Sequence, residues 1–417
     1  MSGKASLLVV AGFSLVFLVV AQNFGSISNR AVDNYVEYHT ETVAHNIAIS
    51  GANIAANEVY MDPTWTPTDY PKQFQGGDLD VDVNVVNATF GILEIVSTGT
   101  FHNNSSEIRI TIAPNNFSEY AYYSTYEKGS PTGGPIWWTG KDTVWGPFHT
   151  QDRLRVYRHP SFLGKHTSHR QKIQYYTSKN KDKPVITGIY EPGKSVVIPD
   201  HAVEDLESNA DLNGYKFSGN DTVYLNFQRD SLLYRFSYNG TDSVLNLSTA
   251  APNGLIYAKD CVVRLKGTVK GQYTLGCSSS SASTGKGTVW LDDNIVYETN
   301  PLVDPSSLDL FGIVAENYVY ITDNYANNHT GGIEIQASIF SEKWGFGAYD
   351  HAGRPIGGDI NLLGGIQQNY RQPVGTFGSG GIKSGYTKQY RFDSRLEFIS
   401  PPFYPGTGGF KLVSWFE

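Results

Sequence analysis

Few residues of this chain have the types and spacing that chemistry requires. Asp292 and Asp293 form the best carboxylate pair for cleavage of a glycosidic bond, with Lys286 or Arg354 to assist. Neighbouring residues of a strand point to opposite faces, so the two carboxylates would not meet at one bond. Motifs of phosphate loops, dinucleotide sites, serine hydrolases and zinc peptidases do not occur. We therefore predict no catalytic residues and a protein that is not an enzyme, with a secreted polysaccharide-cleaving β-helix as an alternative.

Two patterns suggest metal ligands. His166 and His169 could form a pair, but no third ligand lies close in the sequence. Asp80, Asp82 and Asn84 copy part of a calcium loop, which would also need a Gly and a closing Glu. The alternation instead predicts the solvated face of a strand. With two cysteines and no C-x-x-C, the sequence predicts no metal site and no cofactor.

Composition bounds the classes of protein that remain. The chain has 417 residues and a net charge of −8, which excludes a basic nucleic-acid-binding protein. With 40% apolar and 13% aromatic residues it can build cores, so disorder is not expected. The 43 glycines and 27 tyrosines favour strands and turns over helices. These numbers predict a mainly β protein of two or three domains.

The amino terminus is the main exception. No charge occurs over 25 residues from Ala5 to Asn29, long enough to cross a bilayer. A signal peptide is the alternative, with Lys4 as its basic start and residues 19–21 as its cleavage site. The apolar surface of this stretch comprises Leu7, Leu8, Ala11, Gly12, Phe13, Leu15, Val16, Phe17, Leu18 and Val20.

The helical pattern continues beyond the apolar stretch. From residue 31 to residue 60 apolar side chains return at helical spacing, and Asp62-Pro63 then ends the pattern. The apolar positions of this part are Val32, Val36, Val43, Ile47 and Ile54. We predict one helix over residues 1–60, roughly 55 residues and about 80 Å long. Its first half needs lipid or other apolar helices, and its second half needs a groove on a folded domain.

This design resembles the N-terminal helix of type IV pilins, on the small-residue run AHNIAISGANIA from Ala44 to Ala55. Pilins usually have a Glu five residues after a Gly cleavage site, whereas here Lys4 follows Gly3 and Asp33 is the first carboxylate. The resemblance implies helices that are held in the inner membrane and then bundle in a filament core. The ten residues of the apolar surface between Leu7 and Val20 are the predicted filament-core residues. The resemblance also implies pilus assembly machinery as a partner.

A small β-sheet head is predicted over residues 61–119. Strands are expected at Leu79–Val85, Phe90–Thr98 and Ile108–Ile112, because apolar and polar residues alternate there. The middle strand, with its turn at Gly99, also resembles the heads of pilins.

Residues 120–417 are predicted to form a β-solenoid, that is, a parallel β-helix. Three segments share an apolar, polar, acidic, small and apolar pattern, which indicates coils of roughly 16 to 23 residues. These segments are Ala258–Val263, Leu291–Tyr297 and Val314–Tyr320. Residues 146–165 could begin the same solenoid, with residues 179–247 inserted as a side domain. A β-sandwich body is the alternative.

Cys261 and Cys277 are 16 residues apart, close to one coil. Adjacent parallel strands lie about 4.8 Å apart, within the reach of a disulfide. We therefore predict that the two cysteines lie on consecutive coils and form a disulfide bond.

The C-terminal run Ser400–Glu417, together with residues 253–257 and 364–367, resembles an uncharacterised bacterial family of pilin-like surface proteins with solenoid-like bodies. The prediction is a structural subunit of an extracellular type IV pilus-like filament, a homopolymer with apolar helices in its core and β domains as its sheath. It would lie in the inner membrane before assembly. The alternative is a membrane-anchored surface adhesin or carbohydrate-binding protein that does not polymerise.

Sequons for N-glycosylation mark loops that we expect to be exposed. They occur at Asn87, Asn103, Asn104, Asn116, Asn220, Asn239, Asn246 and Asn328.

Overall fold

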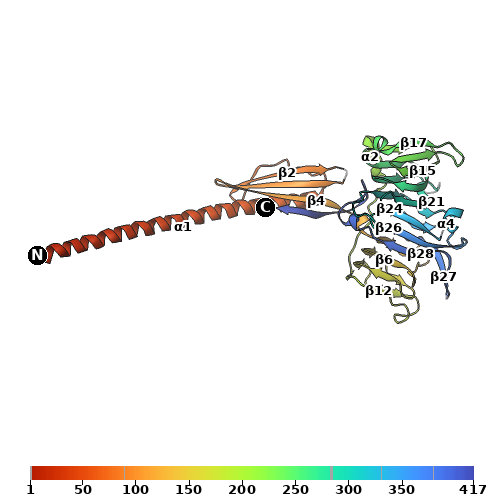
Figure 1. The fold of residues 1–417 in the computed structure, drawn as a ribbon, viewed down its shortest axis with the longest axis horizontal. Coiled ribbons are helices and arrows are strands. Elements are labelled where there is room, and N and C mark those ends of the chain that lie inside the picture. The colour runs from red at the N-terminus through yellow and green to blue at the C-terminus, as the bar shows by residue number, and fades with distance from the viewer. Residues whose placement is uncertain (1, 89, 282–284, 330, 379) are drawn as a thin grey trace. The chain divides into compact units, whose positions relative to one another are not determined.

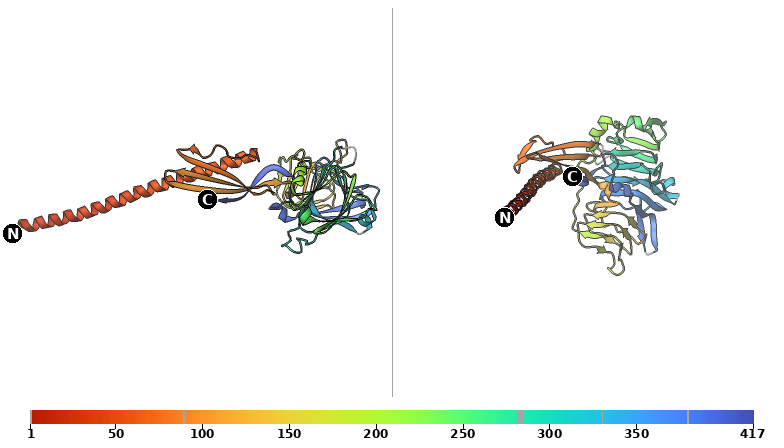
Figure 2. Two further views of the ribbon diagram at one scale, coloured as in Figure 1. Left: turned by 90° about the horizontal axis from the view of Figure 1, so that it is seen from above. Right: turned by 60° about the vertical axis from the view of Figure 1, so that its left-hand side comes forward.

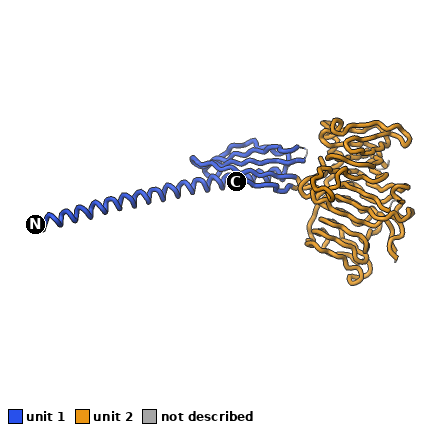
Figure 3. Tube along the Cα trace, viewed as in Figure 1, with its two compact units in different colours: residues 1–113, 410–417 blue, residues 114–409 orange. Residues whose placement is uncertain are grey.

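The computed structural model describes residues 2–88, 90–281, 285–329, 331–378 and 380–417, which divide into two units (Figure 3). Unit 1 comprises residues 1–113 and 410–417, and unit 2 comprises residues 114–409. The boundaries that we predicted at residues 60 and 119 differ from this division. The helix and the small sheet share one core, and the last residues of the chain return to it.

Unit 1 consists of one long helix and a five-stranded sheet in the order β1-β2-β3-β4-β29 (Figure 1). Strands β1 to β4 pair antiparallel. The elements are α1 (Ser2–Met61), β1 (Lys72–Phe74), β2 (Gly77–Asn87), β3 (Ile92–Phe101), β4 (Asn104–Asn116) and β29 (Gly406–Phe416). The long helix and the three strands predicted for this part of the chain are confirmed. The last strand, β29, was not predicted.

The last third of α1 packs on β3 and β2 through small side chains. A row of them is completely buried: Ala44, Ala48, Ala52 and Ala55. A Cβ atom on Gly99 of β3 would lie 2.2 Å from the carbonyl oxygen of Ala44. One on Gly51 of the helix would lie 2.3 Å from Leu79 Cδ1. The helix backbone therefore approaches the sheet more closely than residues with a Cβ would permit.

The helix ends directly after this contact. The Oδ1 atom of Asp62 accepts a hydrogen bond from the backbone N–H of Thr64 at 2.9 Å, and Pro63 has no N–H to continue the helix. Val32 and Val36, which we predicted on the packed face, are instead exposed, because packing begins only at Thr40.

Unit 2 contains most of the strands. The first run of elements is η1 (Phe117–Glu119), β5 (Tyr122–Tyr126), β6 (Thr143–Trp145), β7 (Phe148–Thr150), β8 (Arg155–Val156), β9 (Ser161–Leu163), β10 (His166–Ser168), β11 (Gln174–Tyr175), β12 (Val185–Ile186) and β13 (Tyr190–Pro192). The second run begins with α2 (Asp205–Asn213), β14 (Tyr215–Phe217), β15 (Thr222–Arg229), β16 (Ser231–Arg235), β17 (Ser243–Asn246), α3 (Leu247–Ala250), β18 (Leu255–Ala258), β19 (Val262–Val269) and β20 (Gln272–Cys277). It continues with β21 (Thr288–Tyr297), β22 (Leu310–Ala315), β23 (Val319–Ile321), α4 (Tyr325–His329), β24 (Gly332–Ser341), β25 (Phe346–Ala348), β26 (Ile356–Tyr370), β27 (Gly375–Gly378), β28 (Gly381–Arg391) and η2 (Ser394–Glu397).

Strands of successive coils pair in parallel throughout this stack (Figures 1 and 2). A single ladder of inward side chains runs through ten coils, each residue paired with the next. In order along the stack, its members are Tyr215, Ile256, Leu275, Ile313, Ile339, Ile366, Tyr122, Phe148, His166 and Tyr190. This is the strand pairing that a solenoid requires, and the sandwich alternative, which is built from antiparallel strands, does not fit it.

The chain enters the stack in its middle. Strand β5 pairs with β26, and the strands after it wind outward to β13. Residues 193–214, with α2, then connect to β14, whose place in the ladder is at the opposite end. From there the chain winds back until β26 and β28 lie beside β5 and β6.

This path corrects the predicted side domain at residues 179–247. Strands β12 and β13 belong to one end of the stack, while β14 and β15 form the coil at its other end. Only the antiparallel meander of β15, β16 and β17 resembles an insertion. The predicted range of coil lengths is also too narrow. The coil from Cys277 to its partner Ala315 is twice as long as the coil from Ala258 to its partner Cys277.

Cys261 and Cys277 do lie on consecutive coils, as predicted, but both are free thiols. The Sγ atom of Cys277 lies 3.4 Å from the backbone carbonyl oxygen of Cys261, and its S–H group donates a hydrogen bond to that oxygen. Because Cys261 sits at the corner after β18 and Cys277 ends β20, the thiol of Cys277 meets backbone rather than sulfur. The predicted disulfide bond is therefore absent from the structure.

Two buried ion pairs join the first and last coils at the seam. Arg371 Nη1 lies 2.6 Å from Glu127 Oε2, and Lys388 Nζ lies 2.7 Å from Asp142 Oδ2. The guanidinium of Arg371 also stacks 4.0 Å from the ring centre of Trp138. Burial opposes the charge of Arg371, yet Glu127 more than offsets it and raises the pKa of the guanidinium. Charges therefore fix the register where no short chain connection does.

We predict that Arg371→Met destabilises unit 2 by about 3–5 kcal/mol, because it leaves the Glu127 carboxylate buried without its counter-ion. Adding Glu127→Leu to the same chain should recover most of that loss, since no charge then stays buried. Urea unfolding, followed by tryptophan fluorescence, measures both. A single variant within about 1 kcal/mol of the parent protein would contradict the role of the pair.

Candidate functional site

The exposed part of α1 is the strongest candidate surface for function. Every residue from Gly3 to His39 is exposed in this chain, and this part of the helix contains a long apolar stretch. The ten predicted filament-core residues all lie there, with Phe17 at 70% exposure. By length and composition the helix is able to cross a membrane.

Polar groups on this surface are suited to an apolar environment. The hydroxyl of Ser14 donates to the carbonyl of Val10 at 2.9 Å, so it needs no water. A Cβ atom on Gly12 would meet nothing within 4 Å, which leaves room for another backbone to approach. The surface can thus contact lipid or other helices.

A second stripe follows, beyond the uncharged stretch. Val32, Tyr35 and Val36 are 58%, 68% and 52% exposed and lie at helical spacing on one face. Asp33 lies between them in the sequence, and Arg30 and Glu37 flank them. A charged segment of this kind is not suited to the interior of a bilayer, so its apolar face calls for a protein partner.

Asp292, one member of the carboxylate pair, has partners within unit 2. Asp292 makes an ion pair with Arg264, Nη2 to Oδ1 at 2.5 Å, and accepts a hydrogen bond from Thr322. Lys286 instead pairs with Asp221 at 2.9 Å and Asp260 at 3.4 Å.

Arg354 is buried elsewhere in unit 2. It donates to the backbone carbonyls of Ile321 and Thr322 and to the Tyr386 hydroxyl, so it holds a corner of the solenoid together. The structure therefore does not bring the predicted catalytic candidates together.

The two histidines are also separated. His169 is exposed, whereas His166 is buried in the ladder, stacked 4.5 Å from Phe148. Neither ring nitrogen of His166 has a hydrogen-bond partner among the described residues. Burial lowers the pKa of His166 to about 3, and that of His149 likewise. Across the described residues, no three His, Cys, Asp or Glu side chains are placed to hold a metal ion.

Asp80, Asp82 and Asn84 lie on the exposed face of β2, as the alternation predicted. Among the sequons, Asn103, Asn239 and Asn246 are exposed. Asn87, Asn104, Asn116, Asn220 and Asn328 are half-buried. Those at Asn87 and Asn328 include Thr89 and Thr330, which lie outside the described residues. Their glycosylation stays a prediction.

Sequence reasoning missed one polar recess on unit 2, which contains Trp145 and Arg391. Its residues come from strands far apart in the chain. The only available signal was the recurrence of polar residues two positions apart, as at Gln389 and Arg391 or Glu334 and Gln336.

Comparisons with known proteins give one structural match of interest. The chain is similar in structure to a pilin. The matching structure is that of the competence-associated pilin ComZ from Thermus thermophilus, with a TM-score of 0.36, 10% sequence identity, and coverage of 90% of this chain and 97% of that one. No family model matches the sequence, and no curated protein matches it. The function proposed below rests on the helix and sheets of the chain itself.

The buried histidines predict a dependence of stability on pH. In the unfolded chain they titrate near 6.5, but in the folded chain near 3. Above pH 6.5 the two imidazoles are neutral in both the folded and the unfolded chain, so they do not lower the free energy of unfolding there. As the pH falls from 6.5 toward 3, only the unfolded state takes up these protons, so the free energy of unfolding decreases.

Replacing His166 by Phe should make that decrease shallower, because one proton-binding site of the unfolded chain is lost. At pH 7 the variant should be at least as stable as the parent, since two unpaired ring nitrogens leave the core. Urea midpoints at pH 7 and pH 4.5 test this, with the exposed His169→Gln as control. An equal pH dependence in His166→Phe and the parent would refute it.

Proposed function

We propose that this protein is the structural subunit of an extracellular, type IV pilus-like filament. Its apolar helices would bundle in the core, and its β-rich units would form the sheath. Before assembly the segment from Ala5 to Asn29 would lie in the inner membrane. Pilus assembly machinery would move the helix from lipid into the bundle.

The stripe of Val32, Tyr35 and Val36 carries this proposal. In a helix that only anchors the chain, just the uncharged stretch must be buried, and lipid buries it. Lipid does not suit the stripe, because Asp33 and Glu37 stand beside it. The sheet of the same unit does not bury it either, since packing begins at Thr40. Neighbouring helices of other copies would cover both surfaces at once.

Energy favours such a bundle once the helix leaves lipid. Large apolar side chains such as Phe13, Phe17 and Leu18 are more than half exposed. Burying each one is worth about 1.5–3 kcal/mol, so many of them together make dissociation into water very unfavourable. A filament of this kind would assemble from the membrane and remain stable outside it.

The alternative is a monomeric surface protein that keeps its helix in the membrane. It shares the anchor but leaves the stripe from Val32 to Val36 without a partner. The two functions therefore differ in whether copies contact each other along α1.

We predict that Phe17→Asp abolishes filaments on the cell surface. A carboxylate at this position costs about 3 kcal/mol in a bilayer and several in a dry bundle. Units 1 and 2 should stay folded, because the residue contacts neither of their cores. Negative-stain imaging of the sheared surface fraction provides the measurement.

The matched control is Val85→Asp, which places the same charge at a 65% exposed position on β2. It should give filaments in parental amounts. Normal filaments containing the Phe17→Asp subunit would contradict the proposal, as would a parent strain without filaments.

A further inference from the structure

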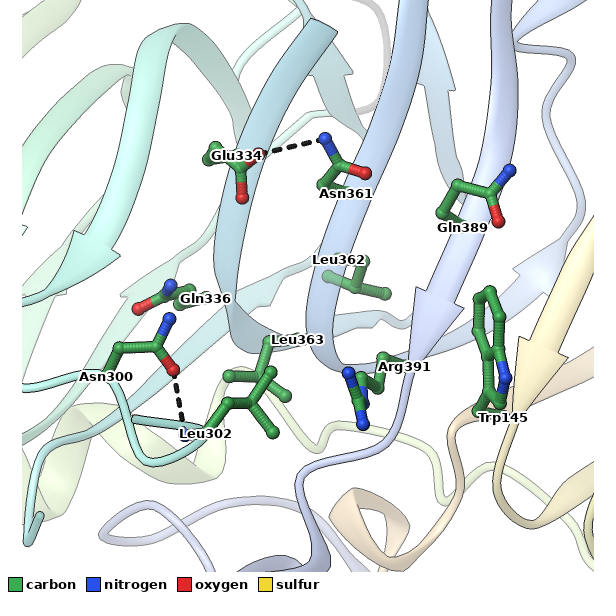
Figure 4. Close-up of a pocket in the computed structure, with 10 residues that line it drawn as sticks. All are labelled: Trp145, Asn300, Leu302, Glu334, Gln336, Asn361, Leu362, Leu363, Gln389 and Arg391. Carbon is green, nitrogen blue, oxygen red and sulfur yellow. Dashed lines mark hydrogen bonds between the residues drawn. The ribbon is translucent and has the colours of Figure 1, made fainter. Parts of the chain in front are cut away.

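A recess of about 420 Å³ lies on the outer face of unit 2, a volume typical of ligand sites (Figure 4). Strands β6, β28, β26 and β24 run side by side beneath it. Asn300 and Leu302, which follow β21, form one of its walls. Strand β6 belongs to the first coil and β28 to the last, so closure of the solenoid assembles the recess.

Strand register arranges the side chains in two rows. In the first row, Trp145 pairs with Arg391, Arg391 with Leu363, and Leu363 with Gln336. The second row, two residues earlier on each strand, contains Gln389, Asn361 and Glu334. Neighbouring strands are about 4.8 Å apart, so the second row offers polar groups at regular intervals, while the first alternates apolar and polar side chains. A linear polymer with a repeated polar unit suits such a surface.

Trp145 supplies an apolar platform at one end (Figure 4). Its side chain is 38% exposed and contacts no other aromatic ring among the described residues. Trp138, Trp290 and Trp344 all have such ring partners. A pyranose ring has one face of C–H groups and a rim of hydroxyls, so its C–H face can lie on the indole while its rim stays polar.

Arg391 and Gln389 supply the polar contacts. Neither side chain makes a hydrogen bond or ion pair to any residue that the structure describes. Asn361 instead holds Glu334, Nδ2 to Oε1 at 2.8 Å, and Gln336 Oε1 accepts from the N–H of Tyr297. Glu334 therefore has a partner of its own, while the guanidinium of Arg391 is open to a carboxylate, which it can bind with two hydrogen bonds.

We propose that this recess binds an acidic polysaccharide, with a pyranose ring on Trp145 and a uronate carboxylate on Arg391. A peptide adding to the sheet is disfavoured, because β28 and β26 are paired on both sides. The site lies within a single unit, so binding does not depend on polymerisation. Its test and the test of the filament are thus independent.

The experiment uses the full-length protein in a zwitterionic detergent, because the sugar headgroups of glycoside detergents would compete. Calorimetry measures binding of tetramers of galacturonic, guluronic and mannuronic acid, with neutral tetramers of galactose and mannose beside them. At least one acidic tetramer should bind more tightly than both neutral ones. Trp145→Ala and Arg391→Gln should each weaken that binding at least tenfold, and Arg391→Gln should remove the preference for acid.

Two matched controls are available on the same unit. Tyr238→Ala removes another exposed aromatic side chain, and Arg153→Gln removes another exposed positive charge; both should bind as the parent does. Absence of binding to every acidic tetramer, or unchanged binding in Trp145→Ala, would overturn the proposal. Loss of surface filaments in both recess variants without any saccharide binding would also overturn it, and would assign the recess to a contact between copies.

Discussion

The contact between the last third of α1 and strand β3 is the constraint on which unit 1 depends. Because Gly99 and Gly51 have no Cβ, the backbone of β3 lies against the backbone of α1, and the backbone of α1 lies against the side chain of Leu79. A row of buried alanines makes the remaining contacts between helix and sheet. Burial begins at Thr40, with the rings of His39 and Phe101 meeting edge to face just before it, so the sheet covers little of the helix N-terminal to that residue. The exposed length of α1 is thus a consequence of where this small-residue face starts.

Closure of unit 2 joins coils that are far apart in the sequence, through strand pairing and two buried ion pairs. A solenoid is normally stabilised between neighbours in sequence, whereas the coils that meet at the seam here are separated by more than two hundred residues. Buried pairs such as Glu127 with Arg371 tolerate only one register, because any shift would leave a charge unpaired in the core. The same closure brings Trp145 beside Arg391, so the recess exists only in the closed stack.

The sequence predicted features that depend on local periodicity. The long helix, strands β2 to β4 and the parallel body all follow from patterns that a few neighbouring residues set. Local patterns do not show where the chain reverses its direction along the stack. The segment from Thr222 to Phe227, for example, would alternate in the same way in a side domain as it does in the end coil. The disulfide failed for a related reason, because spacing in sequence places Cys277 near Cys261 without fixing where each thiol points. His166 occupies a position that is otherwise apolar or aromatic, which its neighbours in sequence do not reveal.

The central claim is that copies of this chain contact each other along α1 beyond the membrane-spanning stretch. Tyr35 tests it most directly, because it is 68% exposed, lies past Arg30 and is not buried by its own unit. A photoreactive benzoylphenylalanine placed there would be activated on intact cells, and the surface fraction analysed by denaturing electrophoresis and mass spectrometry. The filament predicts a ladder of covalent multimers, with adducts on the α1 helix of another copy. Monomers alone, in a surface fraction that contains the protein, would contradict it.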